Sequence, residues 1–161
     1  MTTPVVLLSV RSPHVERLLS GAKTVEFRRR PWKVPDGSTV ILYESRGRRA
    51  IVGSLVVQST AVGSRSAMWE SHGARSGLTR REYREYFAGA RVAVAISVIR
   101  VRQLDEPLTL DELRQRDPAF HVPQSYRFMA SDELGIVLNG ERRSLLRQSS
   151  DIARASQVKS A

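Results

Sequence analysis

The feature that most limits the fold of this chain is a set of apolar segments, rich in β-branched residues, that recur at irregular intervals. Segments of this kind are typical of strands. They lie at residues 4–10, 24–29, 39–45, 50–63 and 92–104. A doubly wound parallel sheet would need strands that alternate regularly with helices. The irregular spacing instead favours an α+β fold, in which short helices pack on a partly open β-barrel.

Short helices are expected between the strands, because their ends carry capping signals. A helix is predicted over residues 12–21, with Ser12 as its N-cap and Gly21 as its C-terminal stop. Two further helices are predicted after Thr79 and Thr109, since each threonine is followed three residues later by a glutamate. These capping boxes predict where the helices begin.

The length of 161 residues suits one compact domain with a substantial core. Apolar content thins after residue 140, so the domain is expected to span 1–140 and residues 141–161 to form a basic, partly disordered tail. Residues 121–129 are expected to be irregular. The first residues lack a basic leader, and no apolar run approaches the roughly 18 residues of a membrane span. A cytoplasmic protein without a membrane partner is therefore predicted.

The charge is strongly positive, with a net value of +10. A polyanionic partner would explain it, and so would the arginine-rich composition of proteins from GC-rich genomes. The distribution of charge along the chain helps to decide between these two explanations. Basic residues outnumber acidic ones by ten to four in 1–50 and by eight to three in 51–104, but acidic residues lead by seven to three in 105–135. A uniform compositional bias would not produce that reversal, so one basic and one acidic face are predicted.

Metal and thiol chemistry are not expected. The chain has no cysteine, which excludes a disulfide framework and a thiolate metal site. Its histidines, His14, His72 and His121, are scattered and lack the spacing of metal ligands. The glycines match neither the P-loop nor the dinucleotide fingerprint. No metal or cofactor is therefore predicted.

The stretch GAKTVEFRRR, residues 21–30, places one acid among several bases. Val25 and Phe27 alternate as they would on a strand with one buried face. Glu26 and Arg28 then share the other face. Such a strand could form a surface ion-pair ladder, contact a nucleic acid or belong to an active site.

The motif residues Gly21, Lys23, Glu26 and Arg28 resemble the G-x-K-x-x-E-x-R motif of ASCH domains, in the PUA-like superfamily. Flanking segments are also similar, so the resemblance covers about residues 5–130. It implies a small mixed β-barrel flanked by short helices, with a cleft that binds RNA, other single-stranded nucleic acid or a modified nucleobase. Some compact relatives are amidohydrolases acting on N4-acetylcytidine, and others are described as ribonucleases. An enzyme of the same fold is therefore the main alternative to a binding module.

The resemblance and the residue chemistry together predict a site. Glu26 is suited to accept hydrogen bonds from a base edge, and arginine to donate to carbonyls or phosphate. The expected ligand-binding residues are Lys23, Glu26, Arg28, Ser45, Ser125 and Tyr126. Lys23 and Glu26 would be catalytic only in an enzyme. The expected contacts to a nucleic-acid backbone are Arg29, Arg30, Arg46, Arg48 and Arg49.

The chain departs from the amidohydrolase pattern at one point. Those relatives have a threonine three residues after the lysine, where this chain has Glu26. Thr24 is adjacent to Lys23 and is expected to point elsewhere, and Glu70 is an insecure match for their downstream glutamate. Binding is therefore the preferred function over amide hydrolysis, and a regulator that binds a small molecule or a partner is a third possibility. Trp32 or Tyr126 could stack a base or simply pack in the core.

Overall fold

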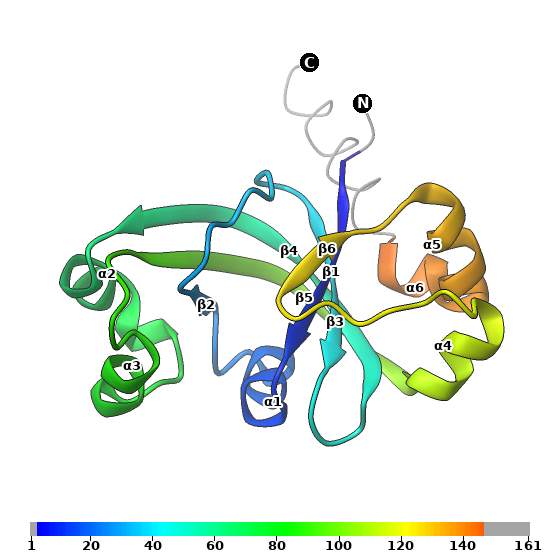
Figure 1. Ribbon diagram of the computed structural model, residues 1–161, viewed down its shortest axis with the longest axis horizontal. Helices are drawn as coiled ribbons and strands as arrows, with labels where there is room; N and C mark the ends of the chain where they lie inside the picture. Colours follow the sequence, from blue (N-terminus) through cyan, green and yellow to red (C-terminus); the bar gives the residue numbers. More distant parts are fainter. Residues whose placement is uncertain (1–2, 147–161) are drawn as a thin grey trace, which may run out of the picture.

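A computed structural model describes residues 3–146, apart from the side chains of residues 142 and 143. Its centre is a six-stranded sheet with the order β2-β5-β4-β3-β1-β6. The strands are β1 (Val5–Val10), β2 (Val25–Arg28), β3 (Thr39–Glu44), β4 (Ala50–Gly63), β5 (Ala93–Thr109) and β6 (Tyr126–Phe128). Strands β1 and β3 are parallel and the other pairs are antiparallel. The sheet curls into a half-barrel, which confirms the predicted mixed α+β fold (Figure 1).

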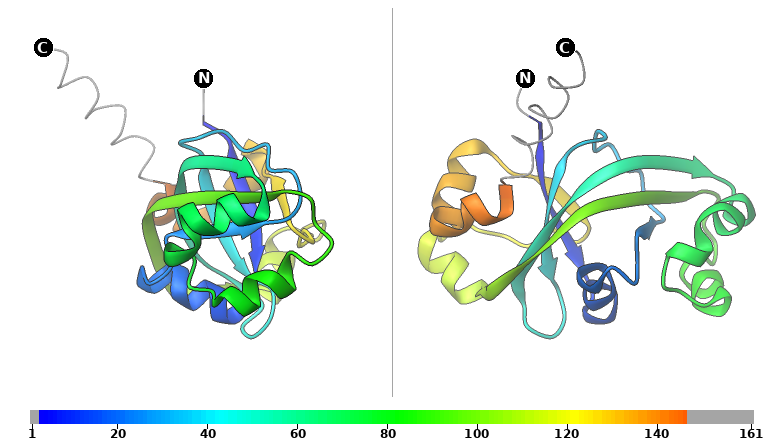
Figure 2. Two further views of the ribbon diagram at one scale, coloured as in Figure 1. Left: turned by 90° about the vertical axis from the view of Figure 1, so that its left-hand side faces the viewer. Right: turned by 180° about the vertical axis from the view of Figure 1, so that it is seen from behind.

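The curl comes from the two longest strands. The β4–β5 ladder changes register between Ile51 and Gly53, and twice more toward Ser59, and such bulges bend and twist a strand. At Gly53 the two backbones approach so closely that a Cβ would lie 2.1 Å from the carbonyl oxygen of Arg102. Beyond the bend the two strands continue as an arched ribbon toward α2 and α3 (Figure 2).

The helices are α1 (Ser12–Ser20), α2 (Arg65–His72), α3 (Arg80–Tyr86), α4 (Leu110–Arg116), α5 (Ser131–Leu138) and α6 (Arg142–Leu146), with single 3₁₀ turns at Gly73–Arg75 and Asn139–Glu141. Both predicted capping boxes are present, at Thr79 for α3 and at Thr109 for α4. Helix α1 ends at Gly21 with a φ of 80°, as glycine allows. The predicted N-cap of α1 is wrong: Arg11 holds that position and Ser12 is already helical.

Three apolar clusters hold these elements together. One fills the half-barrel, and a second lies under α4, α5 and α6. The third joins α3 to the motif strand through Val25, Phe27, Tyr83 and Phe87. Residues 64–91, here called the α2–α3 lobe, thus lie at one end of the sheet, and α4 to α6 lie at the other (Figure 1).

The C-terminal part of the chain differs from expectation in two places. Residues 126–128 form β6, which pairs with β1, so the segment 121–129 is not irregular throughout. Helix α6 follows residue 140, and its Leu145 is buried in the second cluster. The rest of the expected tail, 147–161, lies outside the described residues. Within the described chain, none of the helices combines the length and the apolar character that a bilayer crossing requires.

Candidate functional site

The motif strand β2 is an edge strand, paired with β5 only. Glu26 lies opposite Ile96 and Phe27 opposite Ala95. Val25 and Phe27 pack into the aromatic cluster of the lobe, as their alternation predicted. Glu26 and Arg28 form ion pairs on the opposite side of the strand. The pairing with a strand 70 positions away in the sequence therefore decides where the motif lies.

A buried carboxylate is held between two cations. The Glu26 carboxylate lies 3.0 Å from Lys23 Nζ through one oxygen and 3.0 Å from Arg28 Nη2 through the other. Lys23 is 2% exposed and Glu26 7% exposed. Burial alone would raise the pKa of Glu26, but the charges of Lys23 and Arg28 more than offset it, so the pKa is lowered. Glu26 is therefore ionised at neutral pH despite its burial.

Backbone hydrogen bonds fix the loop before the strand. The amide of Lys23 donates to the carbonyl of Arg17 at 3.0 Å, and that of Thr24 donates to Arg75 at 2.9 Å. On the other side, Arg28 Nη2 donates to the Ser9 carbonyl at 3.0 Å. Helix α1, the lobe and β1 thus each position part of the motif.

The ion pairs form one wall of a cavity of about 480 Å³, a volume typical of small-ligand sites. Four of the predicted residues line it together: Lys23, Glu26, Arg28 and Ser45. They come from the α1–β2 loop, β2 and the end of β3. The structure therefore brings these four side chains together at one cavity.

Other lining residues were missed from the sequence. Ser9, His14, Glu82 and Tyr86 all contribute. The spacing of the histidines bears only on metal binding and gives no sign that His14 lines a cavity. Glu82 and Tyr86 are four residues apart on α3, a spacing that indicates a shared helix face, but nothing local shows that this face meets the motif. These residues reach the cavity only because the lobe packs beside β2.

Two of these groups, His14 and Tyr86, have pKa values that are shifted mainly by burial. Burial, and then the charge of Lys23, lower the pKa of His14, so the neutral imidazole is favoured. Burial raises the pKa of Tyr86, although the charge of Arg28 opposes this. Among the described residues that line this cavity, His14 Nδ1, Glu26 Oε2 and Arg28 Nε are buried without a hydrogen-bond partner, although Glu26 Oε2 lies within ion-pair distance of Lys23. The cavity therefore retains unused hydrogen-bonding capacity at its wall.

Ser125 and Tyr126 are not among the residues that line the cavity. The Tyr126 ring packs on Trp32 at a centroid distance of 4.6 Å, and its hydroxyl accepts a hydrogen bond from the Lys33 amide at 3.1 Å. Packing thus accounts for both aromatic residues. The two residues before Ser125 line the cavity instead, namely Pro123 and Gln124.

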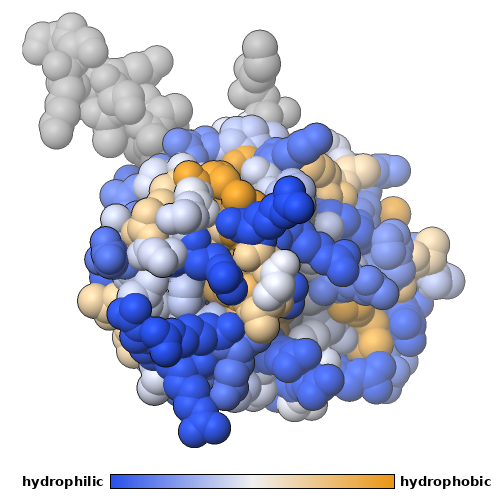
Figure 3. Space-filling model, turned by 60° about the vertical axis from the view of Figure 1, so that its left-hand side comes forward, coloured by the Kyte–Doolittle hydropathy of each residue, from blue (hydrophilic) through white to orange (hydrophobic). Residues whose placement is uncertain are grey.

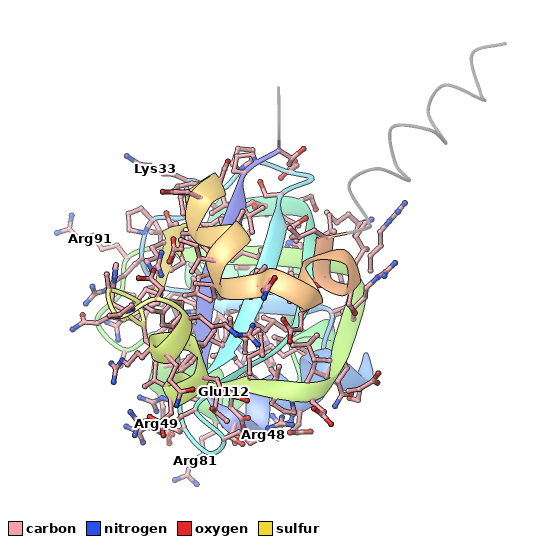
Figure 4. All side chains as sticks on the ribbon, turned by 90° about the vertical axis from the view of Figure 1, so that its right-hand side faces the viewer. Lys33, Arg48, Arg49, Arg81, Arg91 and Glu112 are labelled. Atoms are coloured by element: carbon pink, nitrogen blue, oxygen red, sulfur yellow. The ribbon has the colours of Figure 1, made fainter. Side chains whose placement is uncertain are left out.

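The arginines expected at a nucleic-acid backbone fall into two groups. Arg29 donates to the carbonyls of Tyr86 and Ala88, which ties β2 to the end of α3. Arg48 forms ion pairs with Glu44 and Glu16. The remaining three are exposed, namely Arg30, Arg46 and Arg49. Figure 4 labels Arg48 and Arg49 on the β3–β4 hairpin.

The lysine, threonine and downstream glutamate of the amidohydrolase relatives have no counterpart set within the described part of this cavity. Thr24 is exposed, and no threonine is found among the described residues that line the cavity. Glu70 is exposed on α2, outside this cavity. In residues 3–146 no three His, Cys, Asp or Glu side chains converge as a metal site would require. The chemistry of the cavity rests on Lys23, Glu26 and Arg28 and on the groups around them.

Comparisons with known proteins bear on the family and on the fold. The model of the ASCH domain family matches residues 8–102. A curated protein of Zymomonas mobilis, described as an ASCH domain-containing ribonuclease, is 28% identical over 127 residues, covering 79% of this chain and 85% of the relative. The crystal structure of ASCH from Zymomonas mobilis superposes with a TM-score of 0.78 at 25% identity, over 83% of this chain and 93% of that one.

A more distant structure shares the fold alone. Human THYN1, solved in complex with DNA containing 5-methylcytosine, has a TM-score of 0.53 at 12% identity, with 86% of this chain and 98% of that one covered. The family model spans more than half of the chain, and its start and end enclose the motif, the cavity wall at β2 and the whole lobe. The chain therefore belongs to the ASCH domain family.

Proposed function

We propose that this protein binds RNA, with one unpaired nucleobase held in the cavity. The observation that carries the proposal is the ionised Glu26 carboxylate, buried between Lys23 and Arg28 at the cavity wall. A fixed carboxylate accepts hydrogen bonds from the amino and ring N–H groups of a base edge. Because the two cations hold both oxygens in place, recognition would require little reorganisation.

The surroundings suit a nucleotide. Tyr86 lines the cavity and is 39% exposed, so its ring can stack on a base. The net charge of +10 favours a polyanion. The described relatives point to the same ligand class, since one is described as a ribonuclease and another was solved with DNA. A cytoplasmic location, expected from the sequence, is part of this proposal.

A stacking test separates this proposal from a purely structural role. Tyr86→Leu should weaken binding of a 12-nucleotide single-stranded RNA by roughly 5- to 150-fold, equivalent to the ~1–3 kcal/mol of one base–aromatic stack. The matched control is Phe128→Leu, which removes an aromatic ring of 49% exposure that does not line the cavity. Fluorescence anisotropy at low salt measures both. No binding by the wild type, or equal losses in the two variants, would count against the proposal.

A second candidate function is RNA cleavage. It is favoured by the position of His14 at the cavity wall and by the Zymomonas mobilis relative, which is described as a ribonuclease. A neutral imidazole can accept the proton of a ribose 2′-hydroxyl. The 2′-oxygen would then attack the adjacent phosphorus, the bond to the 5′-oxygen would break, and that oxygen would take up a proton. Lys23 and Arg28 would stabilise the charge that develops on the phosphoryl oxygens.

Cleavage is tested with end-labelled RNA in the presence of EDTA, followed by gel electrophoresis. If the second candidate is right, the wild type produces 2′,3′-cyclic phosphate ends and His14→Gln slows this by about a hundredfold or more, as expected for a general base. His72→Gln, which changes a histidine that lies outside this cavity, should leave the rate unchanged. Binding without cleavage would leave the binding module as the function.

A further inference from the structure

A second cavity lies on the other side of α3. Its volume is about 400 Å³, and it is a cleft between α2 and α3 that is open to solvent. Three arginines line it, Arg65, Arg80 and Arg84, together with the rings of Trp69 and Tyr83. No carboxylate is found among the described lining residues. A site with three guanidinium groups and aromatic walls fits an anion attached to a planar group.

Helix periodicity explains why α3 serves both cavities. Glu82 and Tyr86 are one turn apart and line the first cavity, whereas Arg80 and Arg84 are one turn apart and line the second. At 3.6 residues per turn these pairs project from different sides of the helix. The two cavities are therefore separated by about one helix diameter, roughly 10–12 Å.

The second cavity is built by specific contacts. The Tyr83 hydroxyl donates to the Arg65 carbonyl at 2.8 Å, and Arg65 Nη1 donates to the Phe87 carbonyl at 3.1 Å. The Trp69 ring packs on Tyr83 at a centroid distance of 4.9 Å. These contacts hold α2 against α3 and orient Arg65, which retains further N–H donors.

The acids of α3 do not neutralise the cavity. Glu82 is engaged in the capping box with Thr79, and Glu85 pairs with Arg81 at 3.0 Å. Arg80 and Arg84 are exposed to solvent and take part in no ion pair among the described residues. Figure 3, which brings this side of the molecule forward, shows strongly hydrophilic residues around small apolar patches.

We propose that this second cavity binds the backbone phosphates of the RNA strand whose base enters the first cavity, with Trp69 against a neighbouring base. The inference rests on the proposed function and extends it: the ligand is a strand that crosses α3, not a free nucleoside. Arginine forms paired hydrogen bonds with phosphate, and aromatic rings stack on bases without regard to sequence. The second cavity would then add affinity, and the first would select the base.

The salt dependence of binding tests this directly. For single strands the slope of log affinity against log salt is about −0.7 per phosphate neutralised. Replacing both arginines, as Arg80→Gln with Arg84→Gln, should make the slope for a 12-nucleotide RNA shallower by about 1.4. The control, Arg100→Gln with Arg114→Gln, removes the same charge from β5 and α4, which do not line either cavity. Equal slopes for the two double variants would overturn the inference.

A fluorescence experiment locates the strand. The chain has two tryptophans, so Trp32→Phe leaves Trp69 as the reporter. We expect the 12-nucleotide RNA to quench Trp69 and a mononucleotide, which reaches only the first cavity, to bind without quenching. Binding of the 12-mer without quenching overturns this inference and leaves the proposed function intact. Absence of RNA binding by the wild type overturns both.

Discussion

The two cavities beside α3 use the same kinds of residue in opposite ways. In the first, Lys23 and Arg28 are largely buried and are paired with Glu26 at 3.0 Å. In the second, Arg80 and Arg84 are exposed, and none of the described lining residues is an acid. Both cavities rest on one aromatic cluster, in which the Phe27 and Tyr83 rings meet edge to face at 4.8 Å. Their difference is therefore one of charge pairing and burial, not of scaffold.

This difference determines what each cavity can contribute. Burying a charge costs desolvation energy, and the ion pair offsets that cost only while its geometry is kept. A cavity wall made of such pairs is therefore suited to selecting a ligand by shape. An exposed cation costs little and is screened by salt, so it is suited to holding a backbone. The two cavities thus combine a rigid wall, at the motif strand, with a basic surface, on the lobe, and three substitutions test how far the two are independent.

The largest effect is expected at the buried carboxylate. Glu26→Gln leaves Lys23 and Arg28 facing each other without an acid, and breaking a buried ion pair in this way costs about 3–5 kcal/mol of unfolding free energy. Urea denaturation at pH 7 measures it. The matched control is Glu85→Gln, which breaks an exposed pair with Arg81 of the same 3.0 Å length and should cost less than about 1 kcal/mol.

The difference in stability between the wild type and Glu26→Gln should also depend on pH. The pKa of Glu26 is lowered in the folded state, so its contribution is present above the ordinary value of 4.5 and is lost as the pH falls through the lowered pKa. The stability gap between wild type and Glu26→Gln should therefore narrow below pH 4.5. A gap that is constant with pH, or a Glu26→Gln variant as stable as Glu85→Gln, would show that Glu26 is not held by its two cations.

A smaller effect is expected at the hydroxyl that joins α2 to α3. Tyr83→Phe removes the hydrogen bond to the Arg65 carbonyl and should cost about 1 kcal/mol of unfolding free energy. RNA affinity should fall as well, because the backbone of Arg65 at the start of α2 is no longer tied to α3. Tyr126→Phe removes a comparable hydroxyl, which accepts from the Lys33 amide outside both cavities. A loss of affinity in this control equal to that of Tyr83→Phe would contradict the role of the second cavity.

The smallest effect is expected at His14. Burial and the charge of Lys23 lower its pKa, so below about pH 6.5 the unfolded chain binds more protons than the folded one. Stability contributed by the neutral imidazole should therefore decrease as the pH falls from 6.5 toward the lowered pKa. His14→Gln should flatten this part of the stability profile. The pKa of His72 is also lowered, by burial and by Arg75, and His72 is retained in the variant. Profiles of His14→Gln and wild type that coincide would show that burial and Lys23 do not lower the pKa of His14.

Local signals in the sequence were sufficient for the elements and for the motif. The threonine–glutamate spacing at Thr79 and Thr109 predicted where α3 and α4 begin, because a capping box involves residues only three apart. Gly21 predicted the end of α1, and the run over 50–63 predicted β4 from its first residue to its last. The alternation of Val25 with Glu26 predicted which side of β2 is apolar.

Tertiary structure alone determined which residues line the second cavity and which residues of α3 line the first. Helix α3 reaches the motif because β2 pairs with β5, whose partner residues lie about 70 positions away, and no local pattern encodes that pairing. Contacts between distant segments also decide that Arg29 donates to the Tyr86 carbonyl at the end of α3 and that Tyr126 packs on Trp32 outside the cavity. The composition of residues 1–104 predicted that basic residues would outnumber acidic ones in this part of the chain. Only the packing of the lobe decided which cations are buried beside Glu26 and which remain exposed, since burial is a property of contacts between segments distant in sequence.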